Sequence, residues 1–217
     1  MSMSNNLLVL SAAGMLVTAY LMVGQKALFT AVRLYSAQSW LLGAVAITIA
    51  FAEDRPHLFV TAALTVSLKG LLIPWFLMRV VDRIGIRREI EPFLNVPASL
   101  LICLGLTVVG YRVSTGFPEG ARGVAHHVIG VGLSMLLIGL FLMVTRKKAI
   151  TQILALLTVE NAVFLIALGI TSGMPLVVEL GISFDVLLAV LVLGILVHRI
   201  VERFESMDVS RLSQLKG

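Results

Sequence analysis

Long apolar segments, separated by short polar or charged connections, run along the whole chain. A helix that crosses the hydrocarbon core of a bilayer needs roughly 20 mostly apolar residues. By that measure the sequence predicts seven membrane-spanning helices, at residues 6–24, 28–52, 57–81, 94–113, 123–145, 149–171 and 175–198. The connections carry turn-forming and charged residues. We therefore expect an all-α integral membrane protein that crosses the bilayer several times.

Composition excludes the main soluble classes. Of the 217 residues, 59% are hydrophobic and only 13% are charged, whereas about a quarter of the residues of a soluble domain are charged. A soluble fold of this length could not hide so much apolar side chain from water. The single cysteine, Cys103, excludes an intrachain disulfide and a cysteine-ligated iron–sulfur cluster.

The basic residues are distributed unevenly across the predicted membrane. Thirteen of the 17 Lys and Arg side chains fall on the side that holds the C-terminus, three fall on the other side, and Lys69 lies inside a span. Positively charged connections stay in the cytoplasm, so we expect the N-terminus outside and the C-terminus inside. The net charge of +5 is therefore explained by topology and by contact with lipid, and nucleic acid is not expected as a partner.

The first and last thirds of the chain resemble each other at an offset of 120 to 122 residues. Gln38-Ser39 matches Glu160-Asn161, and the Arg-rich segment 79–84 matches 199–204. We predict two parallel three-helix repeats, formed by the first three and the last three helices, with the fourth helix restoring the orientation. The alternative is that apolar helices with basic ends look alike by composition. The predicted units are 1–93, the linking helix and loop 94–122, 123–204, and a cytoplasmic tail 205–217.

Four polar side chains are predicted at one depth of the membrane. At 1.5 Å rise per residue, Gln38 and Glu160 lie about 18 Å from the basic belt, Asp185 about 20 Å and Lys69 about 15 Å. The hydrocarbon core is roughly 30 Å thick, so all four lie near its middle. Glu179 comes out about 28 Å from His198, near the outer surface, and is a candidate at the edge of this set.

Ionisable residues in the middle of the membrane indicate a role in moving protons or ions. Each costs at least about 2.5–3.5 kcal/mol there, and burial disfavours the charged form of acids and of lysine alike, so their protonation can change near physiological pH. We therefore expect Glu160, Asp185 and Lys69 to form a proton relay, with Gln38 and Glu179 beside them. The alternative is a buried Lys–Asp or Lys–Glu pair that only holds helices together.

A kink is predicted next to Lys69. Pro74 removes the intrahelical donor of the Gly70 carbonyl, and the glycine loosens the same turn. A kink and a free carbonyl beside a buried lysine suit a hydrated path, although ordinary proline kinks are common in membrane helices.

No catalytic, metal or cofactor site is predicted. His126 and His127 diverge by about 100° on a helix, and no second ligand is evident at their depth.

The second half of the chain resembles a known family. The residues that carry the resemblance are Thr145-Arg146-Lys147-Lys148 before a helix with Glu160-Asn161, then the segment 178–185, His198-Arg199 and the tail 207–217. These segments resemble the three-helix K subunit of respiratory complex I and the C subunit of multisubunit cation/proton antiporters. The whole chain resembles the hydrogenase-4 component E family, membrane subunits of formate hydrogenlyase-type complexes.

The resemblance implies a site and partners. The K subunit carries two membrane glutamates in its proton pathway. Glu160 matches the first, and Asp185 matches the second by its position, as an aspartate. In the first repeat Gln38 stands where Glu160 stands in the second, so it would not carry a proton there.

The expected protein is a multi-pass subunit of a bacterial or archaeal cytoplasmic membrane, without a redox centre of its own. Its partners would be antiporter-like membrane subunits and a peripheral hydrogenase and iron–sulfur arm, which segment 82–93 and tail 202–217 are expected to contact. Two alternatives remain. One is a non-conducting scaffold, and the other is a subunit of a cation/proton antiporter.

Overall fold

The computed structural model describes residues 3–52, 54, 56–84, 94–116 and 124–171, and these ranges are helical apart from short connections. The helices are α1 (Met3–Gly24), α2 (Leu28–Ala52), α3 (His57–Leu64), a π-helix η1 (Thr65–Leu72), α4 (Ile73–Ile84), α5 (Val96–Ser114), α6 (Val124–Thr145) and α7 (Ala149–Thr171). No strand occurs in these ranges.

Six segments are long and apolar enough to cross a membrane, with α3, η1 and α4 together forming one of them. Six of the seven predicted spans are therefore confirmed, with boundaries that differ by at most three residues. The seventh, 175–198, lies outside the described residues. The chain is a multi-pass membrane protein, since soluble packing could not cover this much apolar surface.

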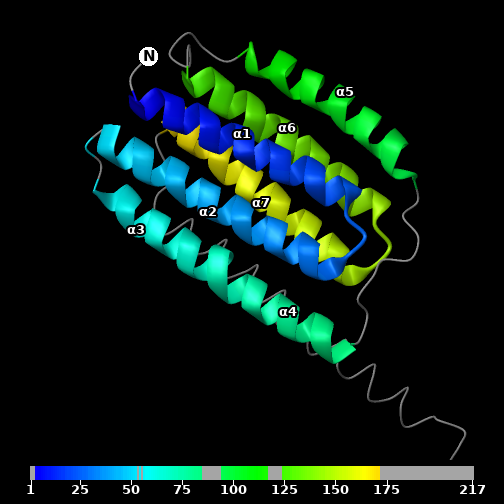
Figure 1. Cartoon of the computed structure of the whole chain (residues 1–217). Helices are drawn as coiled ribbons and strands as arrows, with labels where there is room; N and C mark the ends of the chain where they lie inside the picture. The colour runs from blue at the N-terminus through cyan, green and yellow to red at the C-terminus, as the bar shows by residue number, and fades with distance from the viewer. Residues whose placement is uncertain (1–2, 53, 55, 85–93, 117–123, 172–217) are drawn as a thin grey trace, which may run out of the picture.

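Four helices form the core of the bundle. α1 packs on α2 and on α6, while α7 packs on α6 and on α2. Following the chain in Figure 1, α1 and α6 run in one direction, and α2 and α7 run in the opposite one. Only three residues connect α1 with α2, and three connect α6 with α7. Connections this short make consecutive helices antiparallel neighbours.

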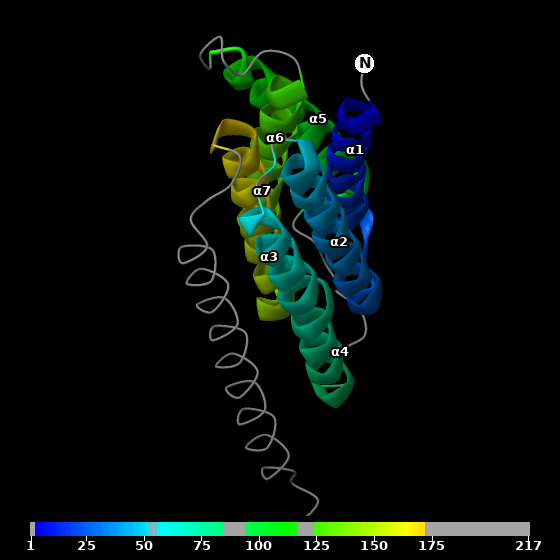
Figure 2. The same cartoon turned by 90° about the vertical axis from the view of Figure 1, so that its left-hand side faces the viewer.

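The remaining helices flank this core. The α3–η1–α4 segment lies along α2, and α5 lies along α6 on another side of the bundle (Figure 2). Asp54, in the turn between α2 and α3, has a φ of 51°, a left-handed conformation that Asp tolerates better than most residues. α5 starts at Val96 with a proline in its first turn, where the missing N–H of proline costs nothing.

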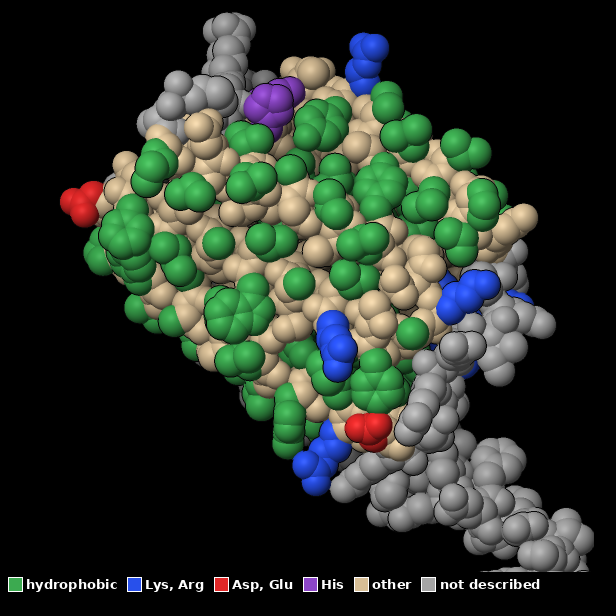
Figure 3. All heavy atoms as spheres, in the orientation of Figure 1, with side chains coloured by type: hydrophobic (Ala, Val, Ile, Leu, Met, Phe, Trp, Pro, Cys, Tyr) green, Lys and Arg blue, Asp and Glu red, His purple; other side chains and the backbone are tan. Residues whose placement is uncertain are grey.

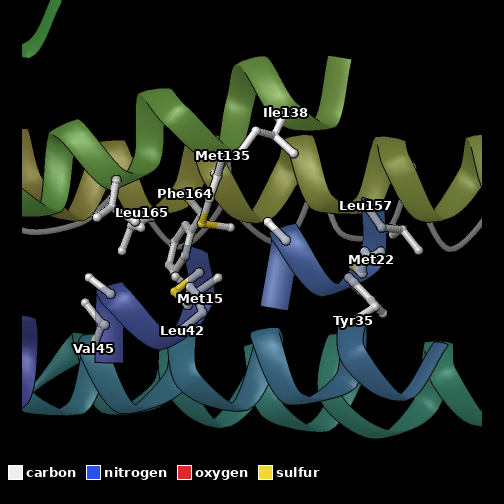
Figure 4. Close-up of a cluster of buried hydrophobic side chains, with 14 of the residues drawn as sticks. Met15, Met22, Tyr35, Leu42, Val45, Met135, Ile138, Leu157, Phe164 and Leu165 are labelled. Atoms are coloured by element: carbon white, nitrogen blue, oxygen red, sulfur yellow. The ribbon is translucent and has the colours of Figure 1, made fainter. Parts of the chain in front are cut away.

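The centre of the bundle is filled by large apolar side chains from all four core helices. Met15, Leu42, Met135 and Phe164 meet there, each at most 2% exposed (Figure 4). The outer face is also apolar, and most charged side chains lie toward its margins (Figure 3). An apolar exterior with charges at the ends is the surface expected of a protein that faces lipid.

Small residues allow two of the helix pairs to come close. A Cβ added at Gly110 of α5 would lie 2.7 Å from the backbone nitrogen of Ser134 on α6. A Cβ at Gly132 of α6 would lie 3.2 Å from the carbonyl oxygen of Ala162 on α7. Lipid supplies no hydrophobic force that presses helices together, so such close packing is a main source of their association.

Candidate functional site

A buried ion pair joins η1 to α7. The Lys69 ammonium Nζ lies 2.7 Å from Oε1 of Glu160, and the two side chains are only 3% and 9% exposed. The same ammonium lies 5.7 Å from the ring centroid of Phe164, which is one helical turn beyond Glu160. The structure thus brings together two residues that the sequence predicts at one depth but on separate helices.

Lys69 sits in the π-helical part of its span. The π-helix η1 covers Thr65–Leu72, and its inward residues are Thr65, Lys69 and Gly70. A π-helix has wider turns than an α-helix and occurs mostly at functional positions. The Gly70 and Pro74 pattern predicts a kink next to Lys69, and the structure has a π-helix followed by α4 at this place.

The carbonyl that Pro74 frees has a donor from another helix. The hydroxyl of Ser36 on α2 donates a hydrogen bond of 2.6 Å to the Gly70 carbonyl oxygen. The indole of Trp40 covers the same glycine, so that a Cβ there would lie 3.2 Å from its Nε1. The expectation of a free carbonyl at Gly70 is therefore wrong, because α2 supplies the missing hydrogen bond.

An amide network lies beside the ion pair. Asn161, the neighbour of Glu160, donates through Nδ2 to Oε1 of Gln38 at 3.3 Å and to Oγ of Ser39 at 3.2 Å. Gln38 in turn donates through Nε2 to the Thr18 hydroxyl at 3.3 Å and to the Met15 carbonyl at 3.4 Å. This network connects α1, α2 and α7 with neutral groups only.

Several buried polar atoms of the bundle have no protein partner within the described residues. They are the hydroxyl oxygens of Tyr35 and Thr61 and Oδ1 of Asn161. In the same part of the chain, no donor other than the Lys69 ammonium contacts the carboxylate of Glu160. Buried polar groups are nearly always satisfied by protein or by ordered water, so the Asn161 amide oxygen and the Glu160 carboxylate are candidates for contact with internal water.

The predicted site residues fall into three groups. Lys69 and Glu160 touch each other. Gln38 lies in the same layer but bonds to Asn161 and to α1. Asp185 and Glu179 lie outside the described residues.

Sequence reasoning assigned no role to Ser36, Tyr35 or Thr18, and it noted Ser39 and Asn161 only as matching positions of the repeat. The available signal was their polar character inside apolar helices, at depths close to that of Gln38 and Glu160.

A second buried basic residue links the two halves of the bundle at one end. Nη2 of Arg146 donates to the carbonyl oxygens of Val23 at 2.7 Å and Met22 at 3.3 Å, at the end of α1. The last carbonyls of a helix have no intrahelical donors, so the guanidinium satisfies them. Arg146 therefore joins the α6–α7 connection to α1 in addition to contributing to the basic belt.

His126 and His127 lie side by side at the start of α6 without an arrangement that would hold a metal. The His126 and His127 rings are 6.1 Å apart between centroids, and Nε2 of His126 lies 3.4 Å from the Ser114 hydroxyl. Across the described ranges, no group of three or more His, Cys, Asp or Glu residues is placed to bind a metal ion.

Comparisons with known proteins cover almost the whole chain. An uncharacterized protein of Mycobacterium tuberculosis is 32% identical over 207 residues, which is 95% of this chain and 94% of the relative. Hydrogenase-4 component E of Escherichia coli K12 is 24% identical over 220 aligned positions, covering 99% of this chain and all of the relative. Its counterpart in Shigella flexneri matches to the same extent.

The chain belongs to the hydrogenase-4 component E family. No protein-family model matches the chain, and no solved structure is similar to it. Both curated relatives align from end to end. The hydrogenase-4 component E family membership therefore applies to both the first and the second half of the chain.

Proposed function

We propose that the chain is an integral membrane subunit of a hydrogenase-4-like respiratory complex, and that it moves protons at mid-membrane through Lys69 and Glu160. The observation that carries the proposal is the buried Lys69–Glu160 ion pair. Charged groups are expensive inside a bilayer and, where present, mark ion and proton paths. The name of the Escherichia coli relative supports a hydrogenase-type parent complex.

The chemistry of the pair suits proton transfer. A lysine and a glutamate in contact can exchange a proton, Nζ–H to Oε1, and turn two buried charges into two neutral groups. The desolvation that disfavours both charges lowers the free-energy difference between these two states. Neutral surroundings from Gln38, Ser39 and Asn161 add hydrogen bonds without adding a competing charge.

Asp185 is proposed as the next member of this relay. It is predicted at the same depth as Glu160 and, like Glu160, it matches a membrane carboxylate of the complex I K subunit. The redox chemistry would belong to partner subunits, a peripheral hydrogenase and iron–sulfur arm with antiporter-like membrane subunits. Coupling would then pass through the membrane carboxylates and not through a cofactor of this chain.

We also propose that the chain consists of two parallel three-helix repeats. Ser39 and Asn161 occupy equivalent positions at an offset of 122 residues, and they hydrogen-bond to each other. A contact between equivalent residues is what a two-fold axis along the membrane normal would produce. The pairing of α1 with α6 and of α2 with α7 supports two parallel repeats related by that axis.

The proposal is tested by Glu160→Gln in the complete complex reconstituted into vesicles. We expect proton translocation to fall by about 10²-fold or more, the range lost when a positioned proton-transfer group is removed. The matched control is Asp54→Asn, which removes one exposed carboxylate in the turn between α2 and α3 and is expected to translocate normally.

Three outcomes bear on the alternatives. Normal translocation by an assembled Glu160→Gln complex would reject the relay and leave a scaffold role. Purification of the chain with antiporter subunits and without any hydrogenase or iron–sulfur subunit would reject the hydrogenase assignment. Loss of translocation in the Asp54→Asn control as well would show that the assay reports general damage to the complex, and the relay assignment would then fall.

A further inference from the structure

Tyr35 is among the largest side chains that the described part of the chain buries completely, and its hydroxyl has no partner there. The side chain is 0% exposed, and its hydroxyl oxygen forms no hydrogen bond of good geometry with the described residues, although the Ser39 side chain lies near it. Buried tyrosine hydroxyls normally find a hydrogen-bond partner. An unpartnered hydroxyl in a packed helical core destabilises the fold, so its presence suggests a function other than stabilising the bundle.

Its position connects it to the ion pair. Tyr35 lies one helical turn before Ser39 on α2, so both side chains share a face of the helix. Ser39 accepts from Asn161, the neighbour of Glu160. Figure 4 shows the Tyr35 side chain pointing toward Met22 of α1 and Leu157 of α7.

Leu157 precedes Glu160 by three residues, so the tyrosine lies beside the turn of α7 that leads to the carboxylate.

The same side of the ion pair leads to the basic end of the bundle. Tyr35 is seven residues from the start of α2 at Leu28, about 10 Å along the helix axis. Lys26 and the connection 146–148 lie at this end. A group between this end and Glu160 occupies the segment that a proton must cross to reach the ion pair from that side.

We propose that Tyr35 is a relay hydroxyl that passes protons, through internal water, between the basic end of the bundle and Glu160. This inference rests on the proposed function. In one step the Tyr35 O–H bond breaks and its proton goes to a water that delivers one of its own protons to the Glu160 carboxylate. At the same time the Tyr35 oxygen takes a proton from a protonated water (H₃O⁺) on the other side, which is left as neutral water. One proton is moved, tyrosine ends neutral, and no electron is transferred.

A hydroxyl suits this step because it can donate and accept at once. A purely structural hydroxyl would instead be held by a fixed partner, as Tyr20 is. The Tyr20 hydroxyl lies 2.7 Å from Oγ1 of Thr107, which itself donates to the Cys103 carbonyl. The Tyr20 hydroxyl therefore donates to Thr107 and joins α1 to α5. Tyr20 and Tyr35 are two tyrosines of the same bundle, one with a structural hydrogen bond and one without.

The test compares Tyr35→Phe with Tyr20→Phe in the complete reconstituted complex. Each change removes one hydroxyl and keeps the ring. For Tyr35→Phe we expect an unchanged or higher midpoint of thermal unfolding, since an unsatisfied polar group is removed. We also expect translocation to fall about tenfold or more, and its solvent hydrogen/deuterium isotope effect to change. For Tyr20→Phe we expect a lower unfolding midpoint and normal translocation.

The outcomes separate this inference from the proposed function. Normal translocation by Tyr35→Phe together with loss in Glu160→Gln would overturn the role of Tyr35 and leave the Lys69–Glu160 relay intact. Normal translocation by both variants would overturn both proposals. A Tyr35→Phe complex that loses unfolding midpoint and translocation in parallel, with an unchanged isotope effect, would show that the hydroxyl is structural and also overturn the inference.

Discussion

Burying the charge of Lys69 or of Glu160 costs free energy, and the opposite charge of the other residue offsets that cost. An isolated charge is strongly disfavoured inside a low-dielectric core, and removing one member of a buried pair leaves the other uncompensated. The 2.7 Å contact offsets these costs, but a buried pair by itself is weak evidence of a stabilising role. Pairs of this kind are often no more stabilising than apolar side chains of the same volume. Stability alone therefore does not explain why two ionisable residues occupy this position.

A double-variant cycle separates a structural pair from a relay. Lys69→Met alone is expected to lower the free energy of unfolding by up to about 3–5 kcal/mol, because the Glu160 carboxylate is then buried without its partner. Lys69→Met combined with Glu160→Gln is expected to recover most of that loss, since no charge remains at the site. Translocation is expected to stay low in both variants. The measurements are thermal unfolding of the purified complex and proton uptake into vesicles.

The same cycle has an outcome that contradicts the relay. If the double variant regained both stability and translocation, the pair would serve only to hold η1 against α7. The exposed carboxylate of Asp54 again provides the control, because Asp54→Asn removes a charge that has solvent around it and is expected to change neither quantity.

Sequence reasoning located the depth of the site but not its contacts. Counting residues from the basic belt placed Lys69, Glu160 and Gln38 in one layer, because helix rise fixes depth. It did not distinguish which acid meets the lysine, since Glu160 and Asp185 have the same predicted depth. It also predicted Gln38 beside the relay without predicting its partners, which are Asn161 and two groups of α1. Rotation about the helix axis decides such contacts.

At the scale of elements, the third span shows a local departure from regular helix. Its middle is the π-helix η1, with the Ser36 hydroxyl bonded to the Gly70 carbonyl. Gly70 and Pro74 predicted an irregularity at this place. They did not predict its type, because a π-helix depends on how neighbouring helices rearrange the backbone hydrogen bonds.

Close approach of α5 and α6 gives a test of helix packing. Gly110→Ala is expected to lower the free energy of unfolding by about 1–3 kcal/mol, the usual cost of overpacking. The added Cβ would lie under 3 Å from the Ser134 backbone nitrogen. The measurement is the loss of folded protein on heating in detergent.

Gly105 on the same helix provides the matched control. An added Cβ there meets nothing within 4 Å, so Gly105→Ala is expected to be neutral or to gain up to about 1 kcal/mol from its higher helix propensity. Equal stability of the two variants would contradict the close α5–α6 contact.

The whole molecule has an asymmetric distribution of charge that predicts its orientation. Lys26 and residues 146–148 lie at one end of the bundle, and the Asp54 turn lies at the other. Basic residues are retained in the cytoplasm, so the end with Lys26 is expected to face inward.

The orientation is checked by cysteine labelling in a Cys103→Ala background. Asp54→Cys is expected to react with a membrane-impermeant maleimide in intact cells, and Lys147→Cys is expected to react only after the membrane is opened. Both positions are exposed in the bundle, so both can be reached by the reagent. The opposite pattern of labelling would reverse the assigned orientation.

The sequence by itself determined the class of protein and the bounds of six spans to within three residues, and it predicted one shared depth for Lys69, Gln38 and Glu160. These properties depend only on distance along the helix axis. The thickness of the hydrocarbon core sets how many apolar residues a helix needs, and the rise per residue sets how deep each residue lies.

Only the tertiary structure decided that Lys69 meets Glu160, that Asn161 joins Gln38 to Ser39, and that Ser36 bonds to Gly70. The physical reason is that these helices are apolar on all sides. Their hydrophobic pattern therefore specifies no preferred face, and the rotation that brings polar groups together is set by the packing of small residues and by hydrogen bonds between helices.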